Sequence, residues 1–131
     1  MIINLTQHSA SAEQRAAGVT DLPASELAAL RAALTFDSCP SATEIRERAE
    51  FIAELACHNG LGTDEGDDPL PQQAMIGGAL WLMEPLAAEL QARGIEPVFA
   101  FSVREVVERT LPDGSAEKTA RFKHVAFIPA L

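Results

Sequence analysis

The chain has 131 residues, a hydrophobic content of 47% and a formal net charge of −9 with a pI near 4.7. This length suits one domain with a sizeable core, so we predict a single domain over residues 1–131. A broadly acidic surface repels polyanions at long range, which disfavours general binding to duplex DNA or RNA. A local site for a small anion is still compatible with this charge.

The sequence carries no sign of membrane insertion or export. No apolar run approaches the roughly 20 residues that span a bilayer, and no basic segment followed by an apolar core opens the chain. The two cysteines, Cys39 and Cys57, show neither a C-x-x-C nor a metal-ligand spacing. We therefore expect reduced thiols in a cytoplasmic protein with no metal and no cofactor.

The first half of the chain predicts a strand, an optional short strand and three helices. Ser41-Ala-Thr-Glu44 is a capping box, in which each side chain can satisfy a free backbone N–H at a helix start. Asn59-Gly60 is a suitable helix end, because Gly tolerates the left-handed conformation found there. The expected elements are a strand over 2–6, a short helix from about 11, an extended segment or strand over 19–22, and helices over 23–34 and 41–60.

The second half begins with a flexible acidic loop at about 60–73, whose carboxylate spacing does not fit a calcium loop. A short buried strand over 74–77 and a helix ending near Arg93 follow. Pro85 cannot donate a hydrogen bond inside that helix, so the helix either starts near Met83 or kinks. A strand over 98–103 comes next, and the turn at Pro112-Asp113-Gly114 indicates a hairpin between 105–109 and 116–128.

This order predicts an α/β fold. Short strands that are apolar throughout are typical of a parallel sheet covered by helices on both faces. We predict a single Rossmann-like three-layer domain, with a mainly parallel sheet and a C-terminal antiparallel β-hairpin. The strands over 2–6, 74–77 and 98–103 are expected to be parallel neighbours.

Polar, small or basic residues follow each of these three strands. Ligands gather at the carboxyl ends of parallel strands, so these residues are expected to face one crevice. The candidate ligand-binding residues are Thr6, Gln7, Gly77 and Gly78, and the candidate catalytic residues are His8, Ser102 and Arg104.

Four of these residues also have a purely structural interpretation. A histidine side chain such as His8 suits proton transfer or phosphate contact, but it could equally cap a strand end. Gly77-Gly78 could cradle an anion with backbone N–H groups or simply form a tight turn. Arg104 offers a fork of donors that fits phosphate, or it could pair with Glu105.

The other two histidines have no assigned role. The sequence does not indicate what His58 does. His124 shares a strand face with Phe122, while Arg121 and Lys123 share the other face. This pattern suits a half-exposed edge strand whose basic side chains discourage aggregation.

Two stretches carry a resemblance to a known family. The strand end Leu5-Thr6-Gln7-His8, and Met75-Ile-Gly-Gly78 followed by a helix and Gly94, resemble minimal CRISPR-associated Rossmann-like proteins of the ring-nuclease type. The resemblance covers about half of the chain and implies a strand-end site for cyclic oligoadenylate, commonly across a dimer axis. Ala74-Met-Ile-Gly-Gly-Ala79 and Phe101-Ser-Val-Arg-Glu105 also resemble uncharacterised bacterial and prophage proteins over nearly the full length, which implies no function.

Two functions follow as expectations. The first is a protein that binds a small nucleotide or other phosphate ligand, extending to a ring-nuclease-like phosphodiesterase; catalysis itself is left open. The alternative is a non-catalytic accessory or interaction protein of a mobile-element or defence locus. A homodimer is expected, because the four consecutive apolar residues Leu80 to Met83 exceed what one helix face can bury.

Overall fold

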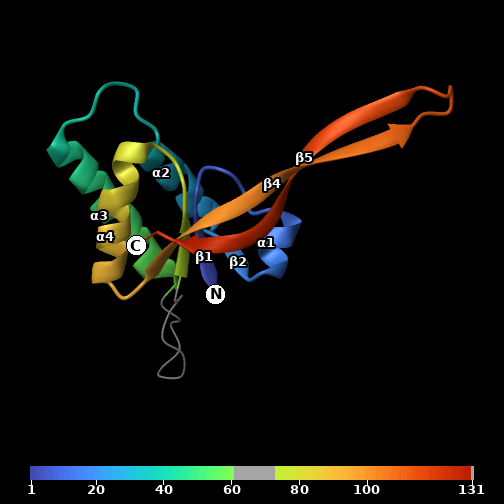
Figure 1. Cartoon of the computed structure of the whole chain (residues 1–131). Helices are drawn as coiled ribbons and strands as arrows, with labels where there is room; N and C mark the ends of the chain where they lie inside the picture. The colour runs from blue at the N-terminus through green and yellow to red at the C-terminus, as the bar shows by residue number, and fades with distance from the viewer. Residues whose placement is uncertain (61–72, 131) are drawn as a thin grey trace.

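The computed structural model describes residues 1–60 and 73–130. Five strands form one sheet in the order β2-β1-β3-β4-β5 (Figure 1). The elements in chain order are β1 (Ile2–Leu5), α1 (Ala12–Ala16), β2 (Val19–Asp21), α2 (Ala24–Leu34), α3 (Ala42–Gly60), β3 (Gln73–Ile76), α4 (Leu80–Ala92), β4 (Glu96–Thr110) and β5 (Ala116–Pro129).

The pairing of the strands confirms the predicted fold class. β1 pairs in parallel with β2 and β3, β3 pairs in parallel with β4, and β4 and β5 are antiparallel. The three strands predicted to be parallel neighbours are therefore neighbours. The segment over 19–22, whose conformation the sequence left open, contributes the edge strand β2.

Helices cover the two faces of the sheet unequally, which gives three layers. Ile3, Leu5, Ala74 and Ile76 point to one face and pack in the main core against α2, α3 and α4. The opposite face carries a smaller cluster of Ile2, Ala10, Val19, Met75 and Val98, on the side of the short α1. In Figure 1, α2–α4 lie on one side of the sheet and α1 on the other.

Two serines begin helices as the sequence predicts. Ser11 and Gln14 form a full capping box at α1. At α3, Ser41 Oγ accepts a hydrogen bond from the Glu44 backbone N–H at 3.1 Å, while the Glu44 carboxylate pairs with Arg48. Only the serine half of the second box is therefore used as a cap.

The helix that contains Pro85 is continuous from Leu80 to Ala92. The alternative start near Met83 is wrong. Pro85 is the sixth residue of α4, so its missing N–H removes the bond that the carbonyl of Trp81 would receive one turn earlier. The consequence is that Gly77-Gly78 leads directly into the first turn of α4.

The structure corrects the prediction for the last two strands. The stretch predicted as a strand over 98–103 and a separate hairpin strand over 105–109 is one strand of 15 residues. No Gly, Pro or turn residue separates the two parts, and the β-branched Val103, Val106 and Val107 favour a continuous strand. β3 pairs with β4 only at Glu96–Val98, so beyond the irregularity at Phe101/Ser102 the hairpin projects from the body.

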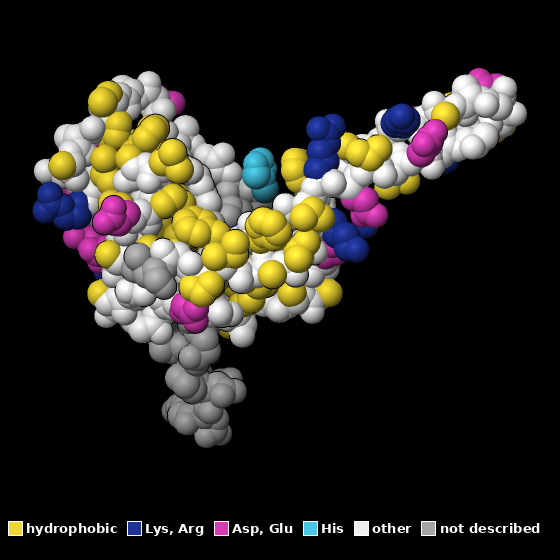
Figure 2. Space-filling model, viewed as in Figure 1, with side chains coloured by type: hydrophobic (Ala, Val, Ile, Leu, Met, Phe, Trp, Pro, Cys, Tyr) yellow, Lys and Arg dark blue, Asp and Glu magenta, His cyan; other side chains and the backbone are white. Residues whose placement is uncertain are grey.

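We call residues 102–124 the arm. Figure 2 shows hydrophobic and basic side chains side by side along it.

The predicted acidic loop at about 60–73 falls almost wholly on residues 61–72, which lie outside the described residues. In the part that is described, no helix combines the length and apolar character needed to cross a membrane.

Two leucines of α4 that differ in burial provide a test of how this helix packs on the core. Leu82 is fully buried and Leu80 is 87% exposed, two positions apart on the same helix. Leu82→Ala is expected to lower the free energy of unfolding by about 2–5 kcal/mol, because it removes buried methyl groups and leaves a cavity. Leu80→Ala should change it by less than about 0.5 kcal/mol. Urea denaturation of both variants measures the difference, and equal effects would contradict the placement of α4.

Candidate functional site

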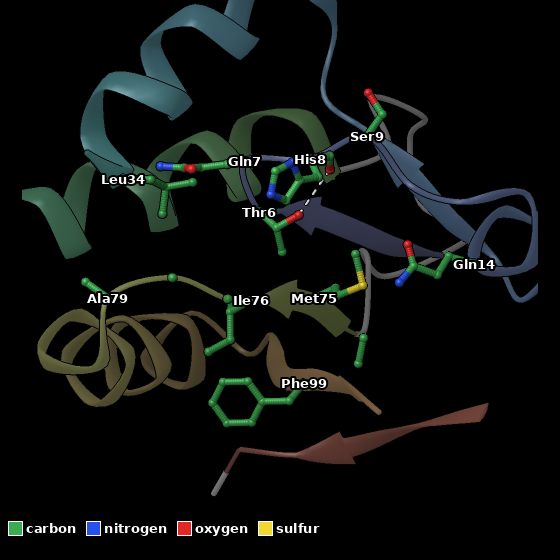
Figure 3. A pocket seen from close by; sticks show the side chains of 13 residues that line it. Thr6, Gln7, His8, Ser9, Gln14, Leu34, Met75, Ile76, Ala79 and Phe99 are labelled. Atoms are coloured by element: carbon green, nitrogen blue, oxygen red, sulfur yellow. Dashed lines mark hydrogen bonds between the residues drawn. The ribbon is translucent and has the colours of Figure 1, made fainter. Parts of the chain in front are cut away.

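A cavity of about 570 Å³ opens at the carboxyl ends of β1 and β3 (Figure 3). One wall is the segment after β1 and the opposite wall is the end of β3 with the turn into α4. The base of β4 contributes as well. The lining residues are Thr6, Gln7, His8, Ser9, Gln14, Leu34, Met75, Ile76, Gly77, Gly78, Ala79, Phe99 and Ala100.

The position of the cavity follows from the topology. β1 and β3 are neighbours, but the chain leaves β1 toward α1 on one face and leaves β3 toward α4 on the other. Diverging connections leave a crevice outside the strand ends, which is where ligands bind in open α/β sheets. The cavity lies at this switch point.

The structure brings together five of the seven predicted site residues. Thr6, Gln7, His8, Gly77 and Gly78 all line the cavity.

Ser102 and Arg104 are not among the lining residues, because β4 continues past them into the arm. The expected common crevice thus forms between β1 and β3 but does not extend to Ser102. The catalytic role given to Ser102 and Arg104 stays a prediction, and the site described below does not depend on them.

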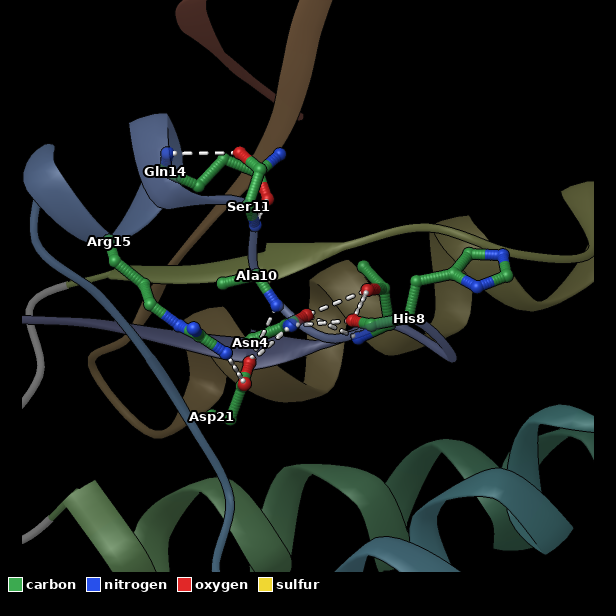
Figure 4. Close-up of polar contacts among 8 residues, drawn as sticks. Asn4, His8, Ala10, Ser11, Gln14, Arg15 and Asp21 are labelled. Carbon is green, nitrogen blue, oxygen red and sulfur yellow. Dashed lines mark hydrogen bonds and ion pairs between the residues drawn. The ribbon is translucent and has the colours of Figure 1, made fainter. Parts of the chain in front are cut away.

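A buried amide holds the segment that carries His8. Asn4 is 3% exposed in the middle of β1, and its Nδ2 donates to the backbone oxygen of His8 at 2.8 Å and to Asp21 Oδ1 at 2.7 Å. Its Oδ1 accepts from the Thr6 backbone N–H at 2.9 Å and lies 2.7 Å from the Thr6 hydroxyl. Figure 4 shows that this network ties β1, β2 and the following segment together.

Asp21, at the end of β2, completes the network. Its carboxylate accepts from Asn4, from the Ala10 backbone N–H at 3.0 Å and from Arg15 at 3.1 Å. Burial raises the pKa of this carboxyl, but the hydrogen bonds from Asn4 and Ala10 and the charge of Arg15 outweigh burial, so the pKa lies below its usual value. The network therefore favours the ionised carboxylate.

The opposite wall is formed by the Gly77-Gly78 turn and Ala79, the residue before α4. Gly78 has φ +145°, a conformation that side chains of L-residues rarely adopt, and a Cβ on Gly77 would lie 3.4 Å from the Thr6 methyl group. No side chain in the described part of the protein caps α4, whose first turn starts at Leu80. The free N–H groups and the positive end of the helix dipole at this wall are suited to an anion.

His8 is the one titratable side chain among the lining residues. It is exposed, and its imidazole points away from the Asn4–Asp21 network, as Figure 4 shows. Its backbone oxygen is fixed by Asn4, while the neighbouring Gln7 carbonyl accepts from Arg31 Nε at 3.3 Å. The backbone that carries the ring is thus fixed, while the imidazole itself is free to contact a ligand or exchange a proton.

The remaining histidines do not line this cavity. His58 is exposed in the last turn of α3. His124 lies opposite Ser102 in the hairpin and packs on Phe127 with a ring separation of 4.6 Å. Its Nδ1 is buried and finds no partner among residues 1–60 and 73–130. Over the same residues, no group of three or more His, Cys, Asp or Glu side chains could hold a metal ion.

Sequence reasoning missed Asn4 and Asp21. A signal for Asn4 was present, since an amide between Ile3 and Leu5 in a buried strand must find hydrogen-bond partners. No such signal pointed to Asp21, because its partners come from three separate segments.

The parallel sheet with its switch-point crevice places the protein among the α/β proteins with a Rossmann-like fold. The chain belongs to the Uncharacterized protein MJ1673 family, whose model matches residues 1–128. No curated protein and no solved structure matches the chain.

The lowered pKa of Asp21 predicts a pH dependence. A carboxyl with a depressed pKa in the folded state stabilises the fold above its unfolded pKa, and this contribution is lost as the pH falls through the folded pKa. Asp21→Asn keeps the shape but loses the charge, so it should cost about 1 kcal/mol at neutral pH. The gap between the two proteins should close below about pH 4. Urea denaturation across pH measures it, and a gap that persists in acid would contradict the assignment.

Proposed function

We propose that the chain binds a small nucleotide, or another small phosphate-containing ligand, in the switch-point cavity. The observation that carries this proposal is the convergence of His8 and the Gly77-Gly78 turn on one cavity, directly before an uncapped 13-residue helix. Backbone N–H groups at such a helix start bind phosphate without a basic side chain. A titratable imidazole on the facing wall adds a second polar contact.

The dimensions and lining support a small ligand. About 570 Å³ lies within the range of small-molecule sites, which combine apolar walls with a few polar groups. Here Leu34, Ile76 and Phe99 supply apolar surface, and Thr6 and Gln7 supply polar groups. No Lys or Arg is among the lining residues, so the site suits a compact anion rather than a nucleic-acid strand.

The resemblance to ring-nuclease-type proteins extends the proposal to cleavage of cyclic oligoadenylate. His8 then removes the proton from a 2′-hydroxyl, whose oxygen attacks the adjacent phosphorus. The bond to the 5′-oxygen breaks, the products are a 2′,3′-cyclic phosphate and a 5′-hydroxyl, and the leaving oxygen takes a proton from solvent. The N terminus of α4 stabilises the charge that develops on the phosphate.

A second candidate function is a non-catalytic accessory or interaction protein. The hairpin of β4 and β5 favours it, because seven of the eleven exposed large hydrophobic side chains in the described residues lie between Phe101 and Ile128. In that case phosphate ligands bind without turnover, or do not bind.

A pair of histidine variants tests the role of His8. His8→Ala should lower cyclic oligoadenylate turnover by about 10²–10⁴-fold, the usual effect of losing a general base. His58→Ala is the matched control, since His58 is also exposed but does not line the cavity. Product formation is followed by chromatography. Wild-type protein that binds without turnover would leave the binding proposal standing and contradict the catalytic extension.

A pair of glycine variants tests the phosphate wall. Gly78 and Gly114 both have positive φ, so alanine should destabilise the fold at either position by about 1–3 kcal/mol. Only Gly78→Ala should also weaken binding of adenosine monophosphate or cyclic oligoadenylate, because only Gly78 lines the cavity. Isothermal titration calorimetry measures the affinity. If neither compound binds the wild-type protein, or if the two variants bind equally well, the proposed site is refuted.

A further inference from the structure

The arm is a two-stranded ribbon with no third strand beside it in the described structure. Its paired residues run from Ser102 with His124 to Thr110 with Ala116, which is about 30 Å of extended chain. A lone two-stranded hairpin is at best marginally stable in water and needs a surface to pack against. The arm projects away from the described body (Figures 1 and 2), which leaves its faces available to another molecule.

The two faces of the arm differ in chemistry. Alternation places Glu105 and Arg109 on one face, with Glu117 and Arg121 opposite them. Both cross-strand ion pairs of the arm lie on this face, Arg109 with Glu117 at 2.7 Å and Arg121 with Glu105 at 3.2 Å. Arg121 also reaches Glu13 of α1 at 3.7 Å. Four of the five charged side chains on this face are therefore paired within the chain, and Lys123 is the fifth.

The other face has the more exposed apolar side chains of the arm, together with charged groups that form no ion pair. It presents Val106, Ala120 and Phe122, and Phe122 is 76% exposed. Arg104, Lys118 and Glu108 lie on the same face, with Glu108 directly opposite Lys118, and none of them forms an ion pair with any residue that the structure describes. This leaves the face with one excess positive charge, and Arg104 is the cation with no carboxylate opposite it. We call this the docking face. Its complement is a surface with an exposed aromatic ring surrounded by carboxylates.

The outer face of α3 has these properties. Phe51 is 44% exposed, and Glu47, Glu50 and Glu54 lie within one turn of it on the exposed side. Of these carboxylates, only Glu54 has an ion-pair partner in the described structure, Arg93 at 2.9 Å.

The distribution of charge along the chain supports the same match. The arm contains five of the ten basic residues and four of the nineteen acidic ones, a net charge of +1, and the rest of the chain has −10.

We propose that the docking face of the arm packs on the outer face of α3 of a second copy of this chain. Each copy has both surfaces, and in the proposed contact two copies exchange arms reciprocally, which gives a closed two-fold dimer rather than an open chain. Phe122 and Phe51 form its apolar centre, and Arg104 and Lys118 face the α3 carboxylates. This surface is distinct from Leu80–Met83, and the inference does not depend on the ligand of the cavity.

Sedimentation equilibrium of the full chain at micromolar concentrations tests the contact. The wild-type protein should be a dimer, and Phe122→Thr and Phe51→Ser should each raise the dissociation constant about 30-fold or more, as for a central aromatic contact. Val107→Thr is the matched control, an exposed apolar residue on the ion-paired face of the arm, and it should leave the dimer unchanged. Circular dichroism checks that each variant is folded.

A charge exchange identifies the partner surface. Arg104→Glu should weaken the dimer, and adding Glu47→Lys to the same chain should restore it, because the reversed pair again attracts. Arg104 suits this test because its cross-strand neighbour is the uncharged Phe122. A monomeric wild-type protein, or a dimer that is insensitive to Phe122→Thr, would overturn the proposal. A dimer weakened by Phe122→Thr but not by Phe51→Ser, and not restored by Glu47→Lys, would overturn the assignment to α3.

Discussion

The architecture depends on one constraint: β1 pairs in parallel with β3, but the chain continues from β1 to one face of the sheet and from β3 to the other. This pairing places Ile3 and Leu5 beside Ala74 and Ile76, so that one continuous apolar surface receives α2, α3 and α4. The same pairing prevents any connection from closing over the two strand ends. The core and the cavity are therefore consequences of a single topological choice, and a change that stabilised another strand order would remove both.

A switch-point crevice becomes a defined site only if the segments around it are fixed. At the β1 side, Asn4 fixes the segment. It is a polar residue in an otherwise apolar buried strand, so its amide must find hydrogen-bond partners within the protein. Its hydrogen bonds to His8 and Thr6, and through Asp21 to Ala10, fix a segment that has no regular secondary structure. The β3 side needs no such network, because Gly77-Gly78 passes directly into a helix. Burial of one polar residue thus serves positioning more than stability, since replacing both partners of a buried hydrogen bond by apolar groups can be nearly neutral.

The sequence was sufficient wherever local chemistry determines the outcome. The apolar strands, the serine caps at Ser11 and Ser41 and the small or polar residues after β1 and β3 predicted the fold and five of the cavity residues. It was insufficient where an outcome depends on distant packing. The helix that contains Pro85 starts at Leu80 because Leu82 and Leu86 are buried against the core, which outweighs one lost hydrogen bond. Likewise, nothing local to Ser102 and Arg104 shows that the neighbouring strand β3 ends earlier and leaves β4 to continue alone.

The separation of charge along the chain is compatible with the proposed anion site in a protein of net charge −9. The helix N terminus at the cavity acts within about one turn, and the body charge is screened beyond roughly 8 Å at physiological ionic strength. A compact phosphate in the cavity is therefore governed by Gly78 and the start of α4, whereas a long polyanion would meet the acidic body. Half of the basic residues lie on the arm, where carboxylates within the arm pair with Arg109 and Arg121, and where the proposed contact would place α3 carboxylates of a second copy beside Arg104. The charge pattern thus favours a small ligand and self-association over binding to a nucleic-acid chain.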